Sequence, residues 1–370
     1  MDTLVLDEAP YIDDLLPFTA TRQVVDIRIG ILTLREKWER LLATMGLTRE
    51  GASSGLSAVF PRADDPPMEH TIKVPANLLP TRELVAQLSR LKAAGQLTAA
   101  GLEQLPATRI QYPWHIFQHN AAALTEDFAL LTEGRRSEPA PPDVHVSGKA
   151  VFIEKGARLG ACWLNATTGP IYIGRDAEIM EGSLIRGPFA AGEGAVIKMG
   201  TKIYGATTIG PHCTAGGEIK NSVLFGFSNK GHDGYLGDSV IGEWCNLGAG
   251  TSNSNLKNNA GMIRVCLPAT GKYMEAGLKC GLLMGDYSRA AINTSFNSGT
   301  VTGVAANVFG QGLTPKYIAD FSWGSSPGLR YDWDRALRDI GNWKKLKGRS
   351  LTDAEIQTLK HIFDNIKQID

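Results

Sequence analysis

The sequence predicts an α/β unit followed by a parallel β-solenoid, and a six-residue repeat is the main evidence for the solenoid. An aliphatic residue or alanine returns every six residues at Ile173, Ile179, Ile185, Ala191, Ile197, Ile203, Ile209 and Ala215. Helices repeat about every 3.6 residues and half-buried strands about every 2, so this period predicts short strands separated by tight corners. Three repeats would close one triangular coil of eighteen residues, and the inward aliphatic side chains of successive coils would stack.

Composition and length support the same division. The 41 glycines are concentrated in the second half of the chain, where tight corners need a positive φ or a close backbone approach. A length of 370 residues exceeds one ordinary core and indicates two units. Lysine plus arginine equals aspartate plus glutamate, at 38 each, so no net field favours nucleic acid or an anionic membrane as a partner.

The first unit, 1–110, is predicted to be α/β. Leu4–Leu6 is an apolar strand, Ile27–Leu42 has helical spacing, and the apolar residues of 84–91 share one helical face. A helical linker over 111–143 follows and ends in a proline-rich segment that cannot continue a helix. The sequence therefore places the boundary between the units near its end.

The solenoid is predicted over 144–312, and a helical extension over 313–370. A second series with the six-residue spacing comprises Leu278, Met284, Ala290, Phe296, Thr302 and Val308. In the extension, Trp333–Lys345 has helical spacing, and a capping box at Thr352–Glu355 opens a second helix. This tail could cover the open end of the solenoid.

The sequence also bears on cellular location. Met1–Glu8 has no basic segment ahead of an apolar run, and no stretch of the chain approaches eighteen uninterrupted apolar residues. The five cysteines are odd in number and lack a CxxC spacing, so buried reduced thiols are expected at Cys162, Cys213, Cys245, Cys266 and Cys280. Together these features predict a cytoplasmic protein without a membrane span.

The densest run of uncommon polar residues lies where the six-residue repeat breaks. It comprises Glu218–Asn221, Asn229–Asp238, Asn246–Thr251 and Asn255. His232 stands between Gly231 and Gly234, and an imidazole with an ordinary pKa of about 6.5 can accept a proton near neutral pH. The sequence therefore predicts a groove across neighbouring coils in which His232 is suited to take a proton from an ammonium nucleophile.

At these residues a family resemblance becomes specific. Gly231–Asp238, with Asn246–Thr251 after it and Glu218–Lys220 before it, resembles the acetyltransferase half of the bifunctional N-acetylglucosamine-1-phosphate uridyltransferase / glucosamine-1-phosphate N-acetyltransferase. We identify the chain as a shorter, divergent branch of that family.

The resemblance implies a fold, an assembly and a set of roles. The fold is a left-handed β-helix, assembled as a homotrimer with active sites between subunits. His232 would deprotonate the amine of an amino-sugar phosphate for attack on acetyl-CoA, without a metal. Residues implied in sugar-phosphate contacts are Glu218, Lys220, Tyr235 and Asn246, and the residue implied near acetyl-CoA is Asn255.

The chain departs from the family pattern after Asn255. Where the family commonly has Tyr-Asp-Gly, this chain has Leu256-Lys257-Asn258. The wall of the acetyl-CoA site and the lysine that meets the sugar phosphate are therefore in question. Lys257 is the candidate substitute for that lysine.

The amino-terminal half resembles the sugar-nucleotidyltransferase family through Leu15–Arg22 and Ile29–Leu32. The family's glycine-rich phosphate loop is replaced by the acidic segment Asp7–Asp14, and Gln23-Val24-Val25 stands where a lysine is expected. This indicates a reduced unit that would use a uridine nucleotide and Mg²⁺ only if it is active. Its candidate phosphate ligands are Arg22, Arg28 and Arg35.

Simpler interpretations stay open at this point. Asn246 and Asn255 could be stacked solenoid asparagines, and the amino-terminal arginines could be solvated surface. Two other functions also compete with amino-sugar N-acetylation. One is a non-catalytic trimeric assembly module, and the other is a zinc carbonic anhydrase in which His212 and His232 approach each other as ligands.

Overall fold

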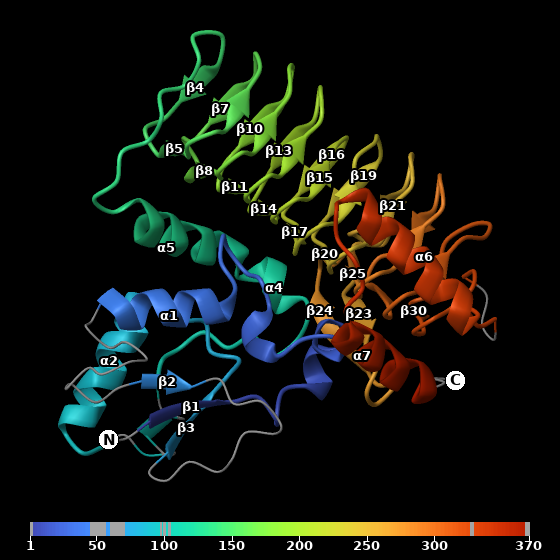
Figure 1. The fold of residues 1–370 in the computed structure, drawn as a ribbon, viewed down its shortest axis with the longest axis horizontal. Coiled ribbons are helices and arrows are strands. Elements are labelled where there is room, and N and C mark those ends of the chain that lie inside the picture. The colour runs from blue at the N-terminus through green and yellow to red at the C-terminus, as the bar shows by residue number, and fades with distance from the viewer. Residues whose placement is uncertain are drawn as a thin grey trace.

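The computed structural model describes residues 3–44, 57–59, 71–96, 98, 101–102, 105–325 and 329–366. Figure 1 shows a solenoid of stacked coils with the amino-terminal unit beside it and the carboxyl-terminal helices along another side. The predicted parallel β-solenoid is confirmed, because the main sheets pair each strand in parallel with the strand of the next coil. The left-handed winding stays a prediction.

Three parallel sheets form the faces of the solenoid. Sheet I contains β4 (His145–Ser147), β7 (Trp163–Asn165), β10 (Leu184–Arg186), β13 (Lys202–Tyr204), β16 (Glu218–Lys220) and β19 (Tyr235–Gly237). Sheet II contains β5 (Val151–Ile153), β8 (Ile171–Ile173), β11 (Phe189–Ala191), β14 (Thr207–Ile209), β17 (Val223–Leu224), β20 (Val240–Ile241), β25 (Leu282–Met284), β28 (Thr300–Thr302) and β30 (Tyr317–Ile318). Sheet III contains β6 (Arg158–Leu159), β9 (Glu178–Ile179), β12 (Val196–Ile197), β15 (Thr214–Ala215), β18 (Asn229–Lys230), β21 (Asn246–Leu247), β26 (Arg289–Ala290) and β29 (Asn307–Val308).

The six-residue repeat follows the inward ladders of this prism. Ile171 pairs with Phe189 and Phe189 with Thr207, each one predicted coil length apart. The next coil is shorter, because Thr208 pairs with Val223. The second series begins at Met284 rather than at Leu278, because Leu278 directly follows strand β24 (Tyr273–Gly277) of a hairpin and is 56% exposed.

That hairpin is an insertion in one coil. Val240 of β20 pairs with Leu283 of β25, and the chain between them forms β22 (Ser252–Asn253) and the antiparallel pair β23 (Ile263–Cys266) and β24. Strand β22 pairs with β27 (Ser295–Phe296) of the following coil. The insertion therefore leaves the stacking of the main sheets intact.

Sheet II is covered on its outer face, so all three residues of β8, β11, β25 and β28 are buried. The covering elements are the amino-terminal unit and the linker helix α5 (Asn120–Thr132), which Figure 1 shows along this side. The rings of Phe18 and Phe225, one from each unit, lie 5.1 Å apart. One hydrophobic core therefore joins the amino-terminal unit to the solenoid.

The amino-terminal unit contains a three-stranded parallel sheet with the order β2 (Ser57–Val59), β1 (Thr3–Asp7), β3 (Thr71–Pro75). Two longer helices accompany it, α1 (Leu34–Thr44) and α2 (Arg82–Ala93). Three short 3₁₀ helices lie at Asp13–Leu15, Phe18–Ala20 and Val24–Asp26.

Helix α1 begins at Leu34 rather than at Ile27, so the predicted helical start was wrong. Gly30 has a φ of +74°, and Arg28 and Thr33 form an antiparallel bridge, so the backbone turns before the helix begins. The backbone N–H groups of Ile31 and Leu32 donate to Asp127 of α5 at 2.7 and 3.1 Å. Asp127, which is distant in the sequence, thus accepts hydrogen bonds from the backbone N–H groups of a turn that the local periodicity predicted to be helical.

The linker segment contains α4 (His115–Gln118) and α5, and it carries buried polar contacts to both units. Lys37 of α1 and Asp127 form a buried ion pair. Asn120 accepts from the N–H of Gly30 at 2.7 Å and donates to the carbonyl of Ala206 at 2.9 Å. The predicted division into domains stays a prediction; sheet I begins at β4, and sheet II continues to β30, beyond residue 312.

The tail forms α6 (Trp333–Leu346) and α7 (Asp353–Asp364), and α7 begins with the predicted capping box at Thr352 and Glu355. It packs along the edge between sheets II and III rather than over an open end, because its apolar residues contact corner residues of successive coils. Those corner residues include Trp244, Tyr287 and Ala305, all with positive φ.

Two further sequence expectations can be compared with the structure. The five cysteines are unpaired and buried, as predicted. Among the described helices, none is both long enough and apolar enough to cross a membrane.

Candidate functional site

A cluster of polar side chains occupies the β13–β19 end of sheet I. The hydroxyl of Tyr204 donates to the carboxylate of Glu218 at 2.6 Å. The amide of Asn255 donates to the Tyr235 hydroxyl at 3.0 Å and also to Asp238. The sequence-predicted residues Glu218, Tyr235 and Asn255 therefore lie in one region of the solenoid surface.

The corner between sheets I and II supports this cluster. Asn221 and Asp238 both have positive φ, at 46° and 48°, and occupy equivalent corners of neighbouring coils. The Asn221 amide donates to Asp238 at 2.7 Å. Asp238 thus accepts from Asn221 and Asn255 with its two oxygens, so it holds Asn255 against Tyr235. Sequence reasoning assigned Asp238 no role, although its neighbours were singled out.

The electrostatics of the cluster keep both tyrosines protonated. The hydrogen bond to Glu218, together with burial, raises the pKa of Tyr204 to about 12. Burial and the Asp238 carboxylate raise the pKa of Tyr235 to about 12. Lys220 lies beside Tyr204, with its Nζ 6.0 Å from the ring centroid. The cluster thus offers the Tyr235 hydroxyl as a donor, the Glu218 carboxylate and Lys220 to a polar ligand.

His232 lies at the corner that connects β18 of sheet III to β19 of sheet I, and its side chain is exposed. The corner is stacked on the equivalent corner of the next coil, because the N–H of Gly250 donates to the carbonyl of Asp233 at 3.0 Å. Tyr235, the first residue of β19, also contacts that coil, since its N–H donates to the Ser252 hydroxyl at 3.0 Å. The backbone that follows His232 is therefore held against the next coil at two points.

Lys230 lies beneath this corner and was not assigned a role from the sequence. It occupies an inward position of sheet III, in register with Ala215, and is 1% exposed. Its Nζ donates to the carbonyl of His232 at 2.5 Å and to that of Gly216 at 3.3 Å. Burial lowers its pKa to about 8. The available sequence signal was a lysine in place of an aliphatic residue of the repeat.

The remaining predicted substrate ligands lie farther apart. Asn246 begins β21 on sheet III, in register with Asn229 and Arg289, one corner away from the tyrosine cluster. Lys257 lies in the inserted segment after Asn255, close enough to Lys316 to lower the pKa of that lysine in addition to the effect of burial. Neither residue forms a hydrogen bond or ion pair with Glu218 or Tyr235 within the described part of this single chain.

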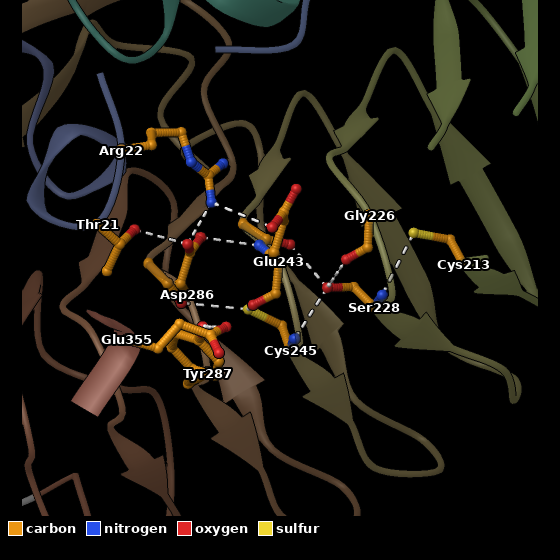
Figure 2. A network of polar contacts seen from close by, with 12 residues as sticks. Thr21, Arg22, Cys213, Gly226, Ser228, Glu243, Cys245, Asp286, Tyr287 and Glu355 are labelled. Carbon is orange, nitrogen blue, oxygen red and sulfur yellow. Dashed lines mark hydrogen bonds and ion pairs between the residues drawn. The ribbon is translucent and has the colours of Figure 1, made fainter. Parts of the chain in front are cut away.

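Figure 2 shows that Arg22 reaches from the amino-terminal unit to the solenoid edge. Its guanidinium pairs with Asp286 and lies 3.7 Å from Glu243, while the Thr21 hydroxyl donates to Asp286 at 2.6 Å. Burial alone would lower the pKa of Arg22, but the two carboxylates raise it above its ordinary value. Arg22 thus serves as a contact between the units in this structure.

The other two candidate arginines also have partners within the chain. Arg28 donates to the carbonyl of Ile31 and lies 3.8 Å from Glu36. Arg35 donates to Asp26 at 2.6 Å and to Gln23 at 2.7 Å. A phosphate at either position would have to compete with these contacts.

A separate hollow of about 470 Å³ opens in the amino-terminal unit. It lies at the carboxyl ends of β1 and β3, the edge where α/β sheets commonly bind ligands. Its lining residues are Pro10, Tyr11, Asp14, Lys73, Pro75, Asn77, Leu102, Arg109 and Gln111. The three arginines predicted from the sequence do not line it, whereas Lys73 and Arg109 do.

The histidines do not assemble a zinc site in the described residues. His212 lies at the edge between sheets II and III, where it stacks on Phe227 with ring centroids 5.0 Å apart. His232 lies at a different edge, between sheets III and I. No group of three potential metal-binding side chains occurs in the part of the chain that is described. The carbonic anhydrase alternative required His212 and His232 to lie close together, and they lie at different edges of the solenoid.

Comparison with known proteins gives a partial match at the amino-terminal end. A family model described as sugar nucleotidyl transferase matches residues 4–108 and 99–136. The match therefore runs through the first unit and most of the predicted linker.

Curated relatives also match only part of the chain. A "Bifunctional sugar-1-phosphate nucleotidylyltransferase/acetyltransferase" of Sulfurisphaera tokodaii is 33% identical over 38% of this chain and 35% of its own length. A "Bifunctional protein GlmU" of Methanocaldococcus jannaschii is 35% identical over 23% of this chain and 21% of its own length. The chain thus covers about a third or less of the length of these relatives.

Two solved structures that align with part of this chain are an acyltransferase and an acetyltransferase. The Arabidopsis UDP-N-acetylglucosamine acyltransferase aligns with 60% of this chain and 89% of its own, at 15% identity and a TM-score of 0.29. The polySia-specific acetyltransferase NeuO aligns with 51% and 85%, at 11% identity and a TM-score of 0.27.

Proposed function

We propose that this chain, a divergent relative of the bifunctional nucleotidyltransferase/acetyltransferase family, transfers the acetyl group of acetyl-CoA to the amine of an amino-sugar phosphate. The observation that carries the proposal is the exposed His232, three residues before Tyr235, which belongs to the cluster with Glu218 and Asn255. A glucosamine-1-phosphate-like acceptor in nucleotide-sugar synthesis fits this arrangement.

The chemistry is direct transfer. The imidazole of His232 removes a proton from the acceptor ammonium, and the free amine attacks the thioester carbonyl. A new C–N bond forms, the C–S bond breaks, and coenzyme A leaves as the thiol after it receives a proton. Backbone N–H groups of the glycine-rich corners would stabilise the oxyanion, while hydroxyl and carboxylate groups of the cluster orient the sugar. No cysteine nucleophile is needed, consistent with the burial of all five.

The test is acetyl-CoA consumption with glucosamine-1-phosphate. We expect His232→Ala to lower kcat by about 10²–10⁴-fold, the usual contribution of a general base. The matched control is His361→Ala, which removes an exposed histidine from tail helix α7. A folded wild-type protein that consumes no acetyl-CoA would overturn the substrate assignment and favour a non-catalytic assembly module.

A second activity, at the amino-terminal hollow, is suggested by the family-model match. Lys73 and Arg109 could meet the phosphates of a uridine nucleotide. However, an acidic segment follows β1 where the family has a glycine-rich loop. In it, Asp7 lies 3.4 Å from Lys73, and Glu8 accepts from the N–H of Val24 at 2.8 Å. Pyrophosphate release with UTP, Mg²⁺ and a sugar-1-phosphate tests turnover, and Arg109→Gln tests whether this hollow is used.

We further propose a cytoplasmic homotrimer. The support is the outer face of sheet I, where Trp163 and Leu184 are each 48% exposed and sheet II's covering elements do not reach. Light scattering of the purified chain should give three times the monomer mass. A monomer at micromolar concentration would contradict the assembly.

A further inference from the structure

Arg289 is a buried cation without a counter-ion in the described residues. It begins β26 of sheet III, and its neighbour Ala290 belongs to the inward core, so Arg289 lies on the outer side. Its relative exposure is 8%, and its Nε and Nη2 atoms are enclosed without any hydrogen-bond partner. No carboxylate in the described part of the chain lies within ion-pair distance of it.

The contrast with Arg22 shows that this is unusual within the same protein. Arg22 has only 9% of its side chain exposed, but it pairs with Asp286. Burying an arginine without a partner is unfavourable, and burial lowers the pKa of Arg289 below its ordinary value. Asp339 is close enough to oppose that effect weakly, yet it accepts a hydrogen bond from the Tyr331 hydroxyl at 2.5 Å.

Polar groups that could share a ligand surround Arg289. Its register partners on the neighbouring strands are Asn246 and Asn307. Both asparagines are partly exposed, and their side chains make no hydrogen bond with any described residue. The guanidinium of Arg289 also lies over the ring of Trp343 of α6, 5.6 Å from its centroid. The aromatic face orients the cation but supplies no hydrogen-bond acceptor in its plane.

We propose that Arg289, together with Asn246 and Asn307, binds a phosphate group of a substrate. A planar guanidinium presents paired N–H donors that match two phosphate oxygens, and the asparagine amides add neutral donors on either side. The choice of ligand rests on the proposed function, in which both the sugar phosphate and coenzyme A carry phosphates. Arg289 would supply a positive charge for the phosphate in place of the family lysine, which is not matched in the segment after Asn255.

The first experiment measures phosphate binding without turnover. Inorganic phosphate is titrated into the full chain, with binding measured by calorimetry and by the shift in Tm. We expect Arg289→Gln to weaken binding about tenfold or more, because a charge-assisted bidentate contact is lost. Arg289→Lys keeps the charge without the fork and should bind with intermediate affinity. The control Arg186→Gln removes an exposed arginine of sheet I and should bind as wild type does.

Further arms identify the source of the phosphate. Glucosamine-1-phosphate is compared with glucosamine, and coenzyme A with its 3′-dephospho form. If Arg289 binds the phosphate of one of these ligands, wild type should bind that ligand more tightly than the form lacking the phosphate. Arg289→Gln should bind the two forms equally, and its KM for that ligand should rise with little change in kcat.

Two results would overturn the proposal: no phosphate binding by wild type, or equal binding by wild type and Arg289→Gln. If Arg289→Gln fails to fold, Asn307→Leu replaces it, and unchanged phosphate affinity there counts against the site. Acetyl transfer by wild type without phosphate binding would remove this site and leave the proposed function standing. Phosphate binding without acetyl transfer would have the opposite consequence.

Discussion

Sheets I and II have the same inward ladders but different outer faces. On sheet II the outward residues Tyr172, Ala190 and Thr208 are buried beneath the amino-terminal unit and α5. On sheet I the outward residues are exposed at one end and form the tyrosine and carboxylate cluster at the other. The inward period therefore specifies the solenoid, whereas the residues between the inward positions decide whether a face packs or binds.

The largest expected difference is in stability. Phe152→Ala on the outer face of sheet II should lower the free energy of unfolding by about 3–5 kcal/mol, because Phe152 is 5% exposed beneath α5 and its removal leaves a cavity. Trp163→Ala on sheet I should cost the isolated chain much less, since Trp163 is 48% exposed. Urea denaturation of both variants makes the measurement. Similar losses for the two would show that sheet I is also covered in solution.

An intermediate effect concerns Lys230, at the corner between sheets III and I. Its folded pKa of about 8 lies below the ordinary 10.5, so the unfolded chain binds more protons between those values. The cost of burying Lys230 is therefore absent above pH 10.5, grows as pH falls from 10.5 to about 8, and levels off below that at about 3 kcal/mol. Relative to Lys230→Met, wild type should gain stability as pH rises from 8 to 10.

The comparison with Lys230→Met removes other titrations that both proteins share. Denaturant midpoints at several pH values give the difference directly. A difference that does not change with pH would mean that Lys230 is charged or neutral throughout, and the inferred burial effect would be wrong.

The smallest expected effect lies within the cluster of sheet I. Tyr204→Phe removes the donor to Glu218 but leaves the ring, so we expect a loss of about 1 kcal/mol in stability. If the cluster orients the acceptor, KM for the amino-sugar phosphate should also rise several-fold. Steady-state kinetics with each substrate varied in turn separate this from an effect on acetyl-CoA. An unchanged KM would exclude Tyr204 from acceptor binding.

Local sequence patterns predicted the elements that depend on local or repeating chemistry. The inward ladder from Ile173 to Ala215 and the capping box at Thr352 both follow from residue spacing alone, and both are present. The start of α1 could not be predicted, because the turn at Gly30 is completed by Asp127 and Asn120 from a distant helix. Propensity does not contain that information.

The candidate site was predicted in part for the same reason. Glu218, Tyr235 and Asn255 were named from motif resemblance, and the structure places them in one region of the solenoid. Asp238, Lys230 and Arg289 were missed as contributors, since their roles depend on which face of the coil they occupy and on what covers it. The roles of all these residues in binding and catalysis stay predictions.

The shared core of the two units also determines when the amino-terminal unit can be completed during synthesis. That core begins with Leu6 and includes Ile263 and Val265 of the inserted hairpin and Val301 of β28. The ribosome must therefore release most of the solenoid before the first unit can bury its apolar surface. Until then this surface has no native cover, and exposed apolar surface of this kind favours aggregation. A truncated first unit made on its own would carry the same exposed surface permanently.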